Sequence, residues 1–327
     1  MQVFDASATR NALPFKRLIP ALRAMFVAGC TVPPRHVHEL SSISGERLTS
    51  LLMPAWLAGC YYGIKTINIA PANAARGLPG LHATYVLFDA VTGVPLALMD
   101  GNEITARRTA AASALAASYL VPNKARHLLV VGAGRIARLL PDAYRAVCNI
   151  DCVTVWARDR VQSHALVTEL RANGHNAVAA DDLQSAVQQA QIVSCATLST
   201  TPLIAGAWLQ SGSHLDLIGS FTPDMREADD ACFVGAALYL DTDEALQKSG
   251  DLIGPLVRGV LSASDVCGTL ASLSRHQVGE FRAQHGHHST TKRTVFKSVG
   301  TALEDLAAAM LVWESSSAPL GQQPHTR

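Results

Sequence analysis

The sequence predicts an α/β protein in which a doubly wound parallel sheet follows a smaller α+β unit. Two observations support this prediction. From Arg126 to Asp241, short apolar runs alternate with helical stretches, and this alternation is typical of a parallel sheet with crossover helices. In the first 120 residues, β-type runs instead follow one another with turns between them. The length of 327 residues also favours two domains over one.

The middle segment begins with the apolar run 127–132, which ends at a glycine and precedes a helical pattern over 135–147. Further short apolar runs with flanking turn residues predict five more strands, at 152–157, 176–180, 192–197, 214–219 and 237–241. The stretches between them predict helices at 159–172 and 182–190. Strands and helices therefore alternate, as a doubly wound sheet requires.

The first part of the chain opens with a helical pattern over 14–29, in which large apolar side chains recur on one face. Gly, Pro and Asn residues mark the turns between the β-type runs that come next, which predict strands at 48–56, 63–70, 81–90 and 94–101. This unit is expected to be mostly antiparallel. At the other end, 298–315 predicts an amphipathic helix that can pack on either domain, and the Ser-, Pro- and Gln-rich residues 316–327 are expected to be disordered.

The composition excludes several classes of protein. The formal net charge is +1, and there is no block of like charge. Non-specific electrostatic binding to nucleic acid or to an anionic membrane surface is therefore not expected. Hydrophobic residues make up 49% of the chain, but no apolar stretch is long enough to span a bilayer, and the first residues do not resemble a secretory signal. Seven scattered cysteines without a C-x-x-C pair are typical of reduced thiols in the cytoplasm.

A dinucleotide-binding loop is predicted directly after the first strand of the middle segment. The residues Gly132-Ala133-Gly134-Arg135-Ile136-Ala137 match G-x-G-x-x-A between a strand and a helix. The first glycine permits a tight turn, and the second lets backbone amides approach a pyrophosphate at the helix N-terminus. Ala137 is small enough for close packing of helix and strand. The alternative, a glycine turn that binds no nucleotide, is less consistent with this context.

The end of the second strand indicates which dinucleotide is bound. An NAD-binding protein usually has Asp or Glu there to bind the ribose 2′-hydroxyl. This chain has Ala157 followed by Arg158, a small residue and a cation that suit the 2′-phosphate of NADPH. Asp159 comes too late for the ribose and is expected to cap the next helix. NADPH is therefore predicted, with NADH as the alternative.

With these residues placed, the chain resembles the ornithine cyclodeaminase/μ-crystallin family along nearly all its length. The most specific matching block is MDGNEITARRTAA, within 97–117. The other matching blocks are LLMPAW (51–56), K-T (65–66), LLVVGAGRIA (128–137), VTVWAR (153–158), ATLSTTPLI (196–204), IGSFTPDMREADD (218–230), YLDTDEALQKSGDL (239–252) and TVFKSVGTALEDLAAA (294–309).

The resemblance implies a domain order that composition alone does not give. It implies a substrate-binding and dimerisation domain at 1–120, completed by the C-terminal helix at 296–315, with a Rossmann-type dinucleotide-binding domain at 121–295 inserted between the two parts. It also implies a homodimer and a substrate that is an amino acid or its cyclic imine.

The resemblance further places three cations where family members hold the α-carboxylate of the substrate, namely Arg35, Lys65 and Arg108. An arginine fork and a lysine point charge can fix a small carboxylate and orient its α-carbon. Each residue has a structural alternative. Arg35 can be a surface arginine, whereas Lys65 lies in an apolar β-run, where an unpaired lysine is costly. Arg107 and Arg108 are adjacent and point to different faces of a helix, so one can be solvated, and the family motif selects Arg108 for the site.

One departure from the cyclodeaminases is informative. Those enzymes have an acidic residue just after the strand-end I-G-x, and this chain has Phe221 there. Phenylalanine cannot act as an acid or base, so cyclodeamination is disfavoured. The stretch around it resembles the imine-reducing members, which implies NAD(P)H-dependent reduction of Δ1-pyrroline-2-carboxylate to L-proline and of Δ1-piperideine-2-carboxylate to L-pipecolate. The alternatives are an amino-acid dehydrogenase, a cyclodeaminase, and a non-catalytic NADPH-dependent binding protein of μ-crystallin type.

Several roles stay open at this stage. The proton donor to the imine is Lys65, His82 or solvent, and His82 can equally be a histidine of a half-buried strand. Asp251 either lines the substrate pocket or caps a helix. No metal is expected, because the histidines within 285–288 lie in a polar segment without carboxylate or cysteine partners at ligand spacing. The candidate cofactor contacts are Thr109, Gly132, Ala133, Gly134, Arg135, Ile136, Arg158, Thr197 and Ser220.

Overall fold

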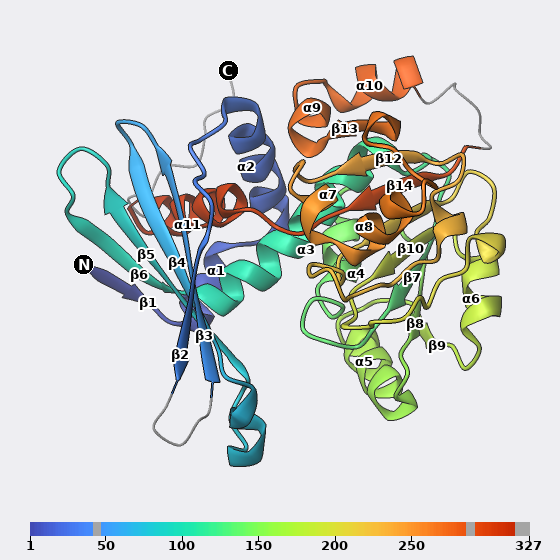
Figure 1. The fold of residues 1–327 in the computed structure, drawn as a ribbon, viewed down its shortest axis with the longest axis horizontal. Coiled ribbons are helices and arrows are strands. Elements are labelled where there is room, and N and C mark those ends of the chain that lie inside the picture. Colours follow the sequence, from blue (N-terminus) through green and yellow to red (C-terminus); the bar gives the residue numbers. More distant parts are fainter. Residues whose placement is uncertain (42–46, 286–291, 318–327) are drawn as a thin grey trace. The chain divides into compact units, whose positions relative to one another are not determined.

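The computed structural model describes residues 1–41, 47–285 and 292–317 (Figure 1). The chain forms two compact units. Unit 1 comprises Met1–Arg108 and Ala302–Arg327, and unit 2 comprises Thr109–Thr301. The chain therefore leaves unit 1 once and returns to it for its last helix. Ser316 and Ser317 belong to that helix, and the rest of the segment predicted to be disordered lies outside the described residues.

Unit 1 contains a six-stranded sheet in the order β1-β6-β5-β4-β3-β2. Neighbouring strands are antiparallel, except that β1 runs parallel to β6. The strands are β1 (Gln2–Phe4), β2 (His36–Ser41), β3 (Arg47–Leu57), β4 (Tyr61–Ile69), β5 (Leu81–Asp89) and β6 (Pro95–Asp100). A 3-10 turn (Pro71–Arg76) connects β4 to β5. The predicted antiparallel α+β unit is thus confirmed.

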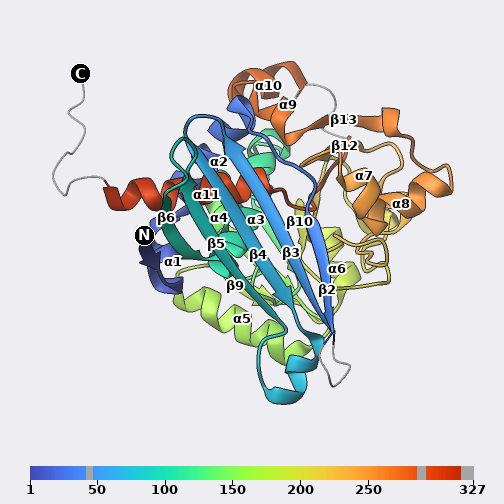
Figure 2. The same ribbon diagram turned by 60° about the vertical axis from the view of Figure 1, so that its left-hand side comes forward.

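Helices cover one face of this sheet. Helix α11 (Ala302–Ser317) contacts β3, β4 and β5, and it also packs on α2 (Phe15–Ala28) (Figure 2). Helix α1 (Ala6–Ala12) lies against β6, and α3 (Gly101–Leu120) follows directly after β6. Because side chains alternate between the two faces of a strand, every second residue along the middle of β4 and β5 is buried under these helices.

Unit 2 contains an eight-stranded parallel sheet in the order β13-β12-β14-β11-β10-β7-β8-β9. Its strands are β7 (His127–Val131), β8 (Cys152–Trp156), β9 (Ala177–Ala179), β10 (Ile192–Cys195), β11 (His214–Leu217), β12 (Ala237–Leu240), β13 (Val266–Thr269) and β14 (Thr294–Lys297). Its helices are α4 (Leu140–Arg145), α5 (Arg160–Ala172), α6 (Leu183–Gln189), α7 (Ala245–Lys248), α8 (Gly250–Val257), α9 (Leu270–Ser274) and α10 (Val278–His285). The predicted doubly wound sheet is confirmed.

The strand order creates a switch point between β7 and β10. From β7 the chain moves to β8 and β9 on one side, and it then returns to place β10 on the other side of β7. Ligands of open parallel sheets bind at the carboxyl ends of the strands beside such a point. The glycine loop after β7 lies at this edge of the sheet.

The structure corrects some predicted elements. The helix expected over 135–147 is only Leu140–Arg145, with turns on either side. Pro141 is the reason: it has no N–H to donate into a preceding turn, so it suits the start of a helix and not its interior. Strands β1, β2, β13 and β14 and helices α1, α7, α9 and α10 were not predicted.

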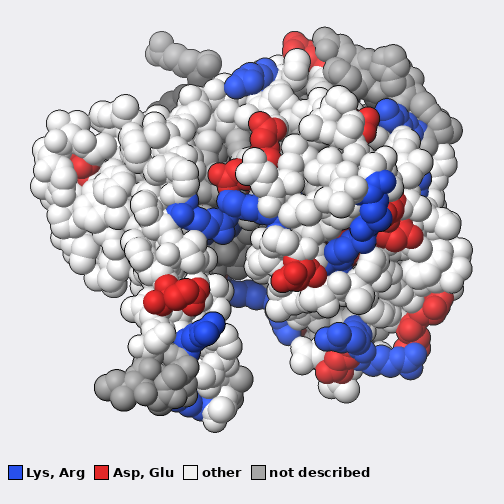
Figure 3. Space-filling view, in the orientation of Figure 1, with Lys and Arg blue, Asp and Glu red and all other residues white. Residues whose placement is uncertain are grey.

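Charged side chains of both signs lie scattered over the face shown in Figure 3, and most of that face belongs to other residues. This distribution agrees with the net charge of +1. In the part of the chain that the structure describes, no helix has the length and apolar character needed to cross a membrane.

Candidate active site

The glycine loop after β7 has the conformation that a dinucleotide loop requires. Gly132 has φ +120°, and its N–H donates to the carbonyl of Trp156 at the end of β8. A Cβ at this position would lie 2.6 Å from the carbonyl oxygen of Ala196. Only glycine fits there, because of both the positive φ and the close approach of backbone. At Gly134 a Cβ would meet no atom within 4 Å, so this side of the loop is open to a ligand.

The end of β8 holds a cation and a helix cap. Arg158 is exposed and follows the buried Ala157. Asp159 caps helix α5, since its carboxylate accepts a hydrogen bond from Val161 N–H at 2.9 Å. The acidic residue nearest the ribose position is therefore engaged in a helix cap, as its sequence position indicated.

A buried carboxylate joins the loops that follow β10 and β11 at the same edge. Glu227 is fully buried, and its Oε1 accepts hydrogen bonds from the N–H and the hydroxyl of Thr197, at 2.7 and 2.8 Å. Its Oε2 accepts from Gly219 N–H at 2.7 Å. Burial raises the pKa of Glu227 to about 7, against the attraction of Lys297. Thr197 and Gly219 are thereby fixed relative to each other.

Asp251 and Ser220 reinforce this arrangement. Asp251 is fully buried in the first turn of α8, and its Oδ1 accepts from the N–H groups of Glu227 and Ala228 at 2.8 and 3.0 Å. Ser220 donates to the carbonyl of Met225 and accepts from Asp251 N–H. The carboxylate predicted to line the pocket or cap a helix thus binds the backbone of a neighbouring loop.

A second buried charged cluster lies within unit 1. Lys65, from β4, is fully buried, and its Nζ lies 2.7 Å from Asp305 Oδ2 and donates to Thr105 Oγ1 at 3.2 Å. Arg108, from α3, places Nε 3.0 Å from Asp305 Oδ1 and Nη1 2.6 Å from Glu304 Oε2. The structure therefore brings Lys65 and Arg108 together on a shared carboxylate, Asp305. We call Lys65, Arg108, Glu304 and Asp305 the charged cluster.

Burial dominates the electrostatics of Lys65. It lowers the pKa of the ammonium from 10.5 to about 8, with a smaller contribution from the nearby Arg108, while Asp305 and Glu304 oppose the change. An ammonium with a pKa near 8 can both bind an anion and release a proton near neutral pH. The neighbouring Arg107 has a separate role, because its Nε donates to the carbonyl of Leu13 and its guanidinium lies 4.7 Å from the centre of the Phe15 ring.

Among the described residues, no hydrogen bond or ion pair links the other predicted residues of unit 1 to Lys65. His82 is exposed, and the register of β4 and β5 puts Tyr85 opposite Lys65, so His82 lies on the other face of the sheet. Arg35 is half-buried just before β2, and no hydrogen bond or ion pair links it to another residue of the described ranges. In unit 2, Thr109 is buried on α3, Arg135 is exposed, and Ala133 and Ile136 are half-buried in the glycine loop.

Sequence reasoning did not find the four buried charged residues that contact predicted site residues, namely Glu227, Lys297, Glu304 and Asp305. Two adjacent acids in the otherwise apolar helix 302–312 were a usable signal, since buried acids need partners. Lys297, fully buried, donates from Nζ to the carbonyl of Leu217 at 3.0 Å, and Asp251 Oδ2 lies 3.7 Å away. The sequence feature that could have revealed Lys297 is its place directly after the apolar residues Val295 and Phe296.

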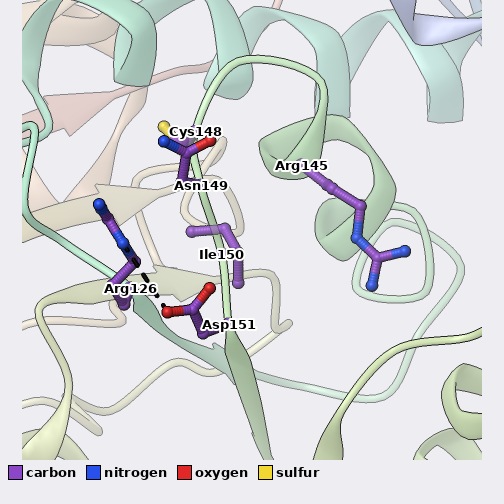
Figure 4. Close-up of a pocket in the computed structure, with 6 residues that line it drawn as sticks. All are labelled: Arg126, Arg145, Cys148, Asn149, Ile150 and Asp151. Atoms are coloured by element: carbon purple, nitrogen blue, oxygen red, sulfur yellow. Dashed lines mark ion pairs between the residues drawn. The ribbon is translucent and has the colours of Figure 1, made fainter.

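A surface hollow of about 550 Å³ opens elsewhere on unit 2 (Figure 4). It lies at the amino ends of β7 and β8, where Arg126 faces Asp151 at 3.7 Å. This is the opposite edge of the sheet from the glycine loop, so the hollow is not part of the dinucleotide site. Among the described residues no group of His, Cys, Asp and Glu could hold a metal ion, and His287 and His288 lie outside them.

The parallel sheet with a glycine loop at its switch point defines a Rossmann-type fold. The chain belongs to the ornithine cyclodeaminase/mu-crystallin family, whose model matches residues 15–319. A Delta(1)-pyrroline-2-carboxylate reductase of Paracoccus denitrificans is 40% identical over 302 residues, which are 92% of this chain and 92% of that protein.

Two solved structures are similar over nearly the whole chain. One is the Delta(1)-pyrroline-2-carboxylate reductase of Thermococcus litoralis in complex with NADH and L-proline, with 28% identity, a TM-score of 0.85 and coverage of 97% of this chain and 98% of that one. The other is an archaeal alanine dehydrogenase dimer with bound NAD, with 25% identity, a TM-score of 0.85 and coverage of 97% and 96%.

Proposed function

We propose that this protein is an NAD(P)H-dependent ketimine reductase that converts Δ1-pyrroline-2-carboxylate to L-proline and Δ1-piperideine-2-carboxylate to L-pipecolate. The named activity of the Paracoccus relative and the ligands of the Thermococcus structure support this substrate class. A nicotinamide cofactor, when bound, supplies the hydride that adds to C2 of the protonated C=N bond.

The observation that favours reduction over cyclodeamination is Phe221. It follows β11 at the carboxyl edge of the sheet, its N–H donates to the carbonyl of Gly219, and its side chain is 45% exposed. An exposed phenyl ring at this position offers no acid or base for the loss of ammonia. Imine reduction requires fewer catalytic groups from the protein than cyclodeamination does. The protein chiefly orients the substrate carboxylate and stabilises charge.

In this proposal Lys65 and Arg108 bind the substrate carboxylate. Both are already oriented by Asp305, so little side-chain entropy is lost when a small anion binds. Lys65, and not His82, is the proposed proton donor to the imine nitrogen. The pKa of Lys65 is about 8, and His82 lies on the opposite face of the sheet. Arg35 is retained as a third contact to the carboxylate.

We further propose that NADPH is preferred over NADH. Arg158 is exposed at the end of β8, where a 2′-phosphate would bind, and Asp159 is engaged in the cap of α5. The candidate contacts Gly132 to Ile136 would face the pyrophosphate, and Thr197 and Ser220 would lie beside the nicotinamide half.

We also propose a cytoplasmic homodimer. The face of the unit 1 sheet opposite α11 presents a row of half-buried aromatic side chains, Trp56, Tyr62 and Phe88, with ring centroids 6.3 and 5.4 Å apart. Rings of this size are typical of the apolar centre of an interface between subunits. Sedimentation of the purified protein tests the dimer, and subcellular fractionation tests the compartment.

Two parallel assays separate the proposal from its alternatives. Oxidation of NADPH with each of the two cyclic imines is expected, and L-ornithine with NAD is expected to release no ammonia. Ammonia release would establish a cyclodeaminase. Reduction of an open-chain 2-oxo acid with ammonia, but of neither imine, would establish a dehydrogenase. NADPH binding without turnover of any of these compounds would favour a binding protein.

A further inference from the structure

The C-terminal helix contributes two acids to the charged cluster, and so far only the orienting contacts of Asp305 have entered the proposed chemistry. Glu304 and Asp305 are fully buried in the first turn of α11. Removing two adjacent carboxylates from water is unfavourable unless each is paired. Their partners are the two cations that the proposed function assigns to the substrate.

Asp305 uses one oxygen for each cation. Its Oδ2 lies 2.7 Å from Lys65 Nζ, and its Oδ1 lies 3.0 Å from Arg108 Nε. Glu304 contacts Arg108 alone among these cations, through Nη1 at 2.6 Å. The two acids therefore differ in geometry, since only Asp305 bridges the strand that holds Lys65 and the helix that holds Arg108.

The charged and titratable groups that face Lys65 come from three elements. From α11, Asp305 and Glu304 favour the ammonium form, and from α3, Arg108 disfavours it. Tyr85, directly opposite on β5, is buried, and its own pKa is raised well above the usual value by burial and by Asp305. Burial is the largest effect on Lys65 and favours the uncharged amine. Asp305 is thus the group that most strongly opposes the effect of burial on the pKa of Lys65.

We propose that Asp305 is a positioning residue of the reaction, which keeps Lys65 protonated and holds its ammonium at a fixed place relative to Arg108. This inference rests on the proposed function for its role in catalysis, because only there do Lys65 and Arg108 act on a substrate. Its effect on Lys65 itself does not depend on the substrate.

The first test follows the charge of Lys65 directly. The chain has six lysines, so a protein with 13C-labelled lysine gives few side-chain signals, and Lys65→Arg identifies the one from Lys65. In Asp305→Asn the pKa of Lys65 is expected to fall by about one unit or more, the usual effect of losing an opposite charge at this distance. Glu304→Gln should lower it less, and Glu103→Gln, which alters an acid paired with Arg10 at 2.7 Å, should leave it unchanged.

The second test follows the reaction with the intact enzyme. The profile of kcat/KM against pH for Δ1-pyrroline-2-carboxylate should show a basic limb that moves to lower pH in Asp305→Asn and returns towards the original pH in Asp305→Glu. In Lys65→Arg that limb should disappear, and the added substitution Asp305→Asn should then shift nothing.

The outcomes separate this inference from the proposed function. An unchanged pKa of Lys65 in folded Asp305→Asn would overturn the inference, whatever happens to the rate. If Asp305→Asn does not fold, Asp305→Ser is compared with Glu304→Gln instead: loss of the Asp305 charge should lower the pKa of Lys65 more than loss of the Glu304 charge, and equal shifts in the two would overturn the inference as well. Absence of imine reduction by the unmodified protein would refute the proposed function, and the lysine signals would still report on Asp305.

Discussion

Glu227 holds Thr197 by two hydrogen bonds to the same carboxylate oxygen, one from the backbone N–H and one from the hydroxyl. The other oxygen binds Gly219 N–H, so one buried side chain connects the loops that follow β10 and β11. A Cβ on Gly219 would lie 2.0 Å from the carbonyl oxygen of Thr197, which shows how closely the two loops approach.

The first prediction concerns this link. In Glu227→Gln the amide NH2 faces either Gly219 N–H or the Thr197 donors, so at least one buried hydrogen bond is lost. NADPH affinity is expected to fall by about tenfold or more, since a hydrogen bond to a charged group contributes about 1.5–3 kcal/mol. Thr197→Val, which keeps the backbone donor, should weaken binding less. Titration calorimetry measures both, and equal affinity in wild type and Glu227→Gln would contradict the prediction.

The second prediction compares the two glycines of the loop after β7. Gly132→Ala combines a positive φ with a close contact to Ala196, so it should lower both the thermal midpoint and NADPH affinity, at a cost of roughly 1–3 kcal/mol or more. Gly134→Ala meets no protein atom, so its thermal midpoint should match that of the wild type. Its NADPH affinity should still fall, because the methyl group would occupy the space of the pyrophosphate. Normal binding by Gly134→Ala would argue against a dinucleotide there.

A third prediction addresses the choice between NADPH and NADH. Arg158→Ala should raise KM for NADPH by about fivefold and leave KM for NADH unchanged, as expected for one exposed charge pair. The matched control is Arg160→Ala, whose guanidinium pairs with Asp181 at 3.3 Å. A loss of NADPH preference in the control but not in Arg158→Ala would place the 2′-phosphate elsewhere.

The fourth prediction concerns stability in acid. His214 is fully buried beside Thr294, and burial lowers its pKa from 6.5 to about 3. The unfolded chain therefore binds a proton between pH 6.5 and 3 that the folded chain does not, so this residue makes stability fall as the pH falls through that window. The full effect is on the order of 5 kcal/mol.

Thermal unfolding of His214→Asn should accordingly be less sensitive to acid than that of the wild type. The Oδ1 atom of the introduced asparagine can replace Nδ1 of His214 as a partner of Thr294. Asp216 provides a control of opposite sign. Burial raises its pKa from 3.8 to about 6, so it makes stability fall as the pH rises between these values, and Asp216→Asn should become more sensitive to acid. Parallel pH profiles of all three proteins would contradict this assignment.

Much of the fold could be predicted because its signals are local. The run before Gly132 is apolar throughout since β7 is buried on both faces, and the helix from Arg160 follows directly after its cap, Asp159. The missed strands lack such signals. All six residues of β2 are exposed, and β1, β13 and β14 have only three or four residues each, too few to show a period.

The candidate site could be predicted only in part, for a related reason. The glycine loop is recognisable because its conformation and its sequence coincide over six residues. The charged cluster is not, since Asp305 meets Arg108 across 197 positions of the chain. The sequence singled out Lys65 and Arg108 by resemblance, and it left their counter-charges unassigned because nothing local to α11 says which buried cations it will meet.

The most direct test of the account is to follow the hydride itself. The enzyme is supplied with Δ1-pyrroline-2-carboxylate and NADPH that carries deuterium in place of both hydrogens at C4 of the nicotinamide, and the product is analysed by chiral chromatography and mass spectrometry. The account predicts L-proline with one deuterium, located at C2, formed by the wild type and lost in Lys65→Ala. Unlabelled proline, or no proline from a protein that still binds NADPH, would contradict it.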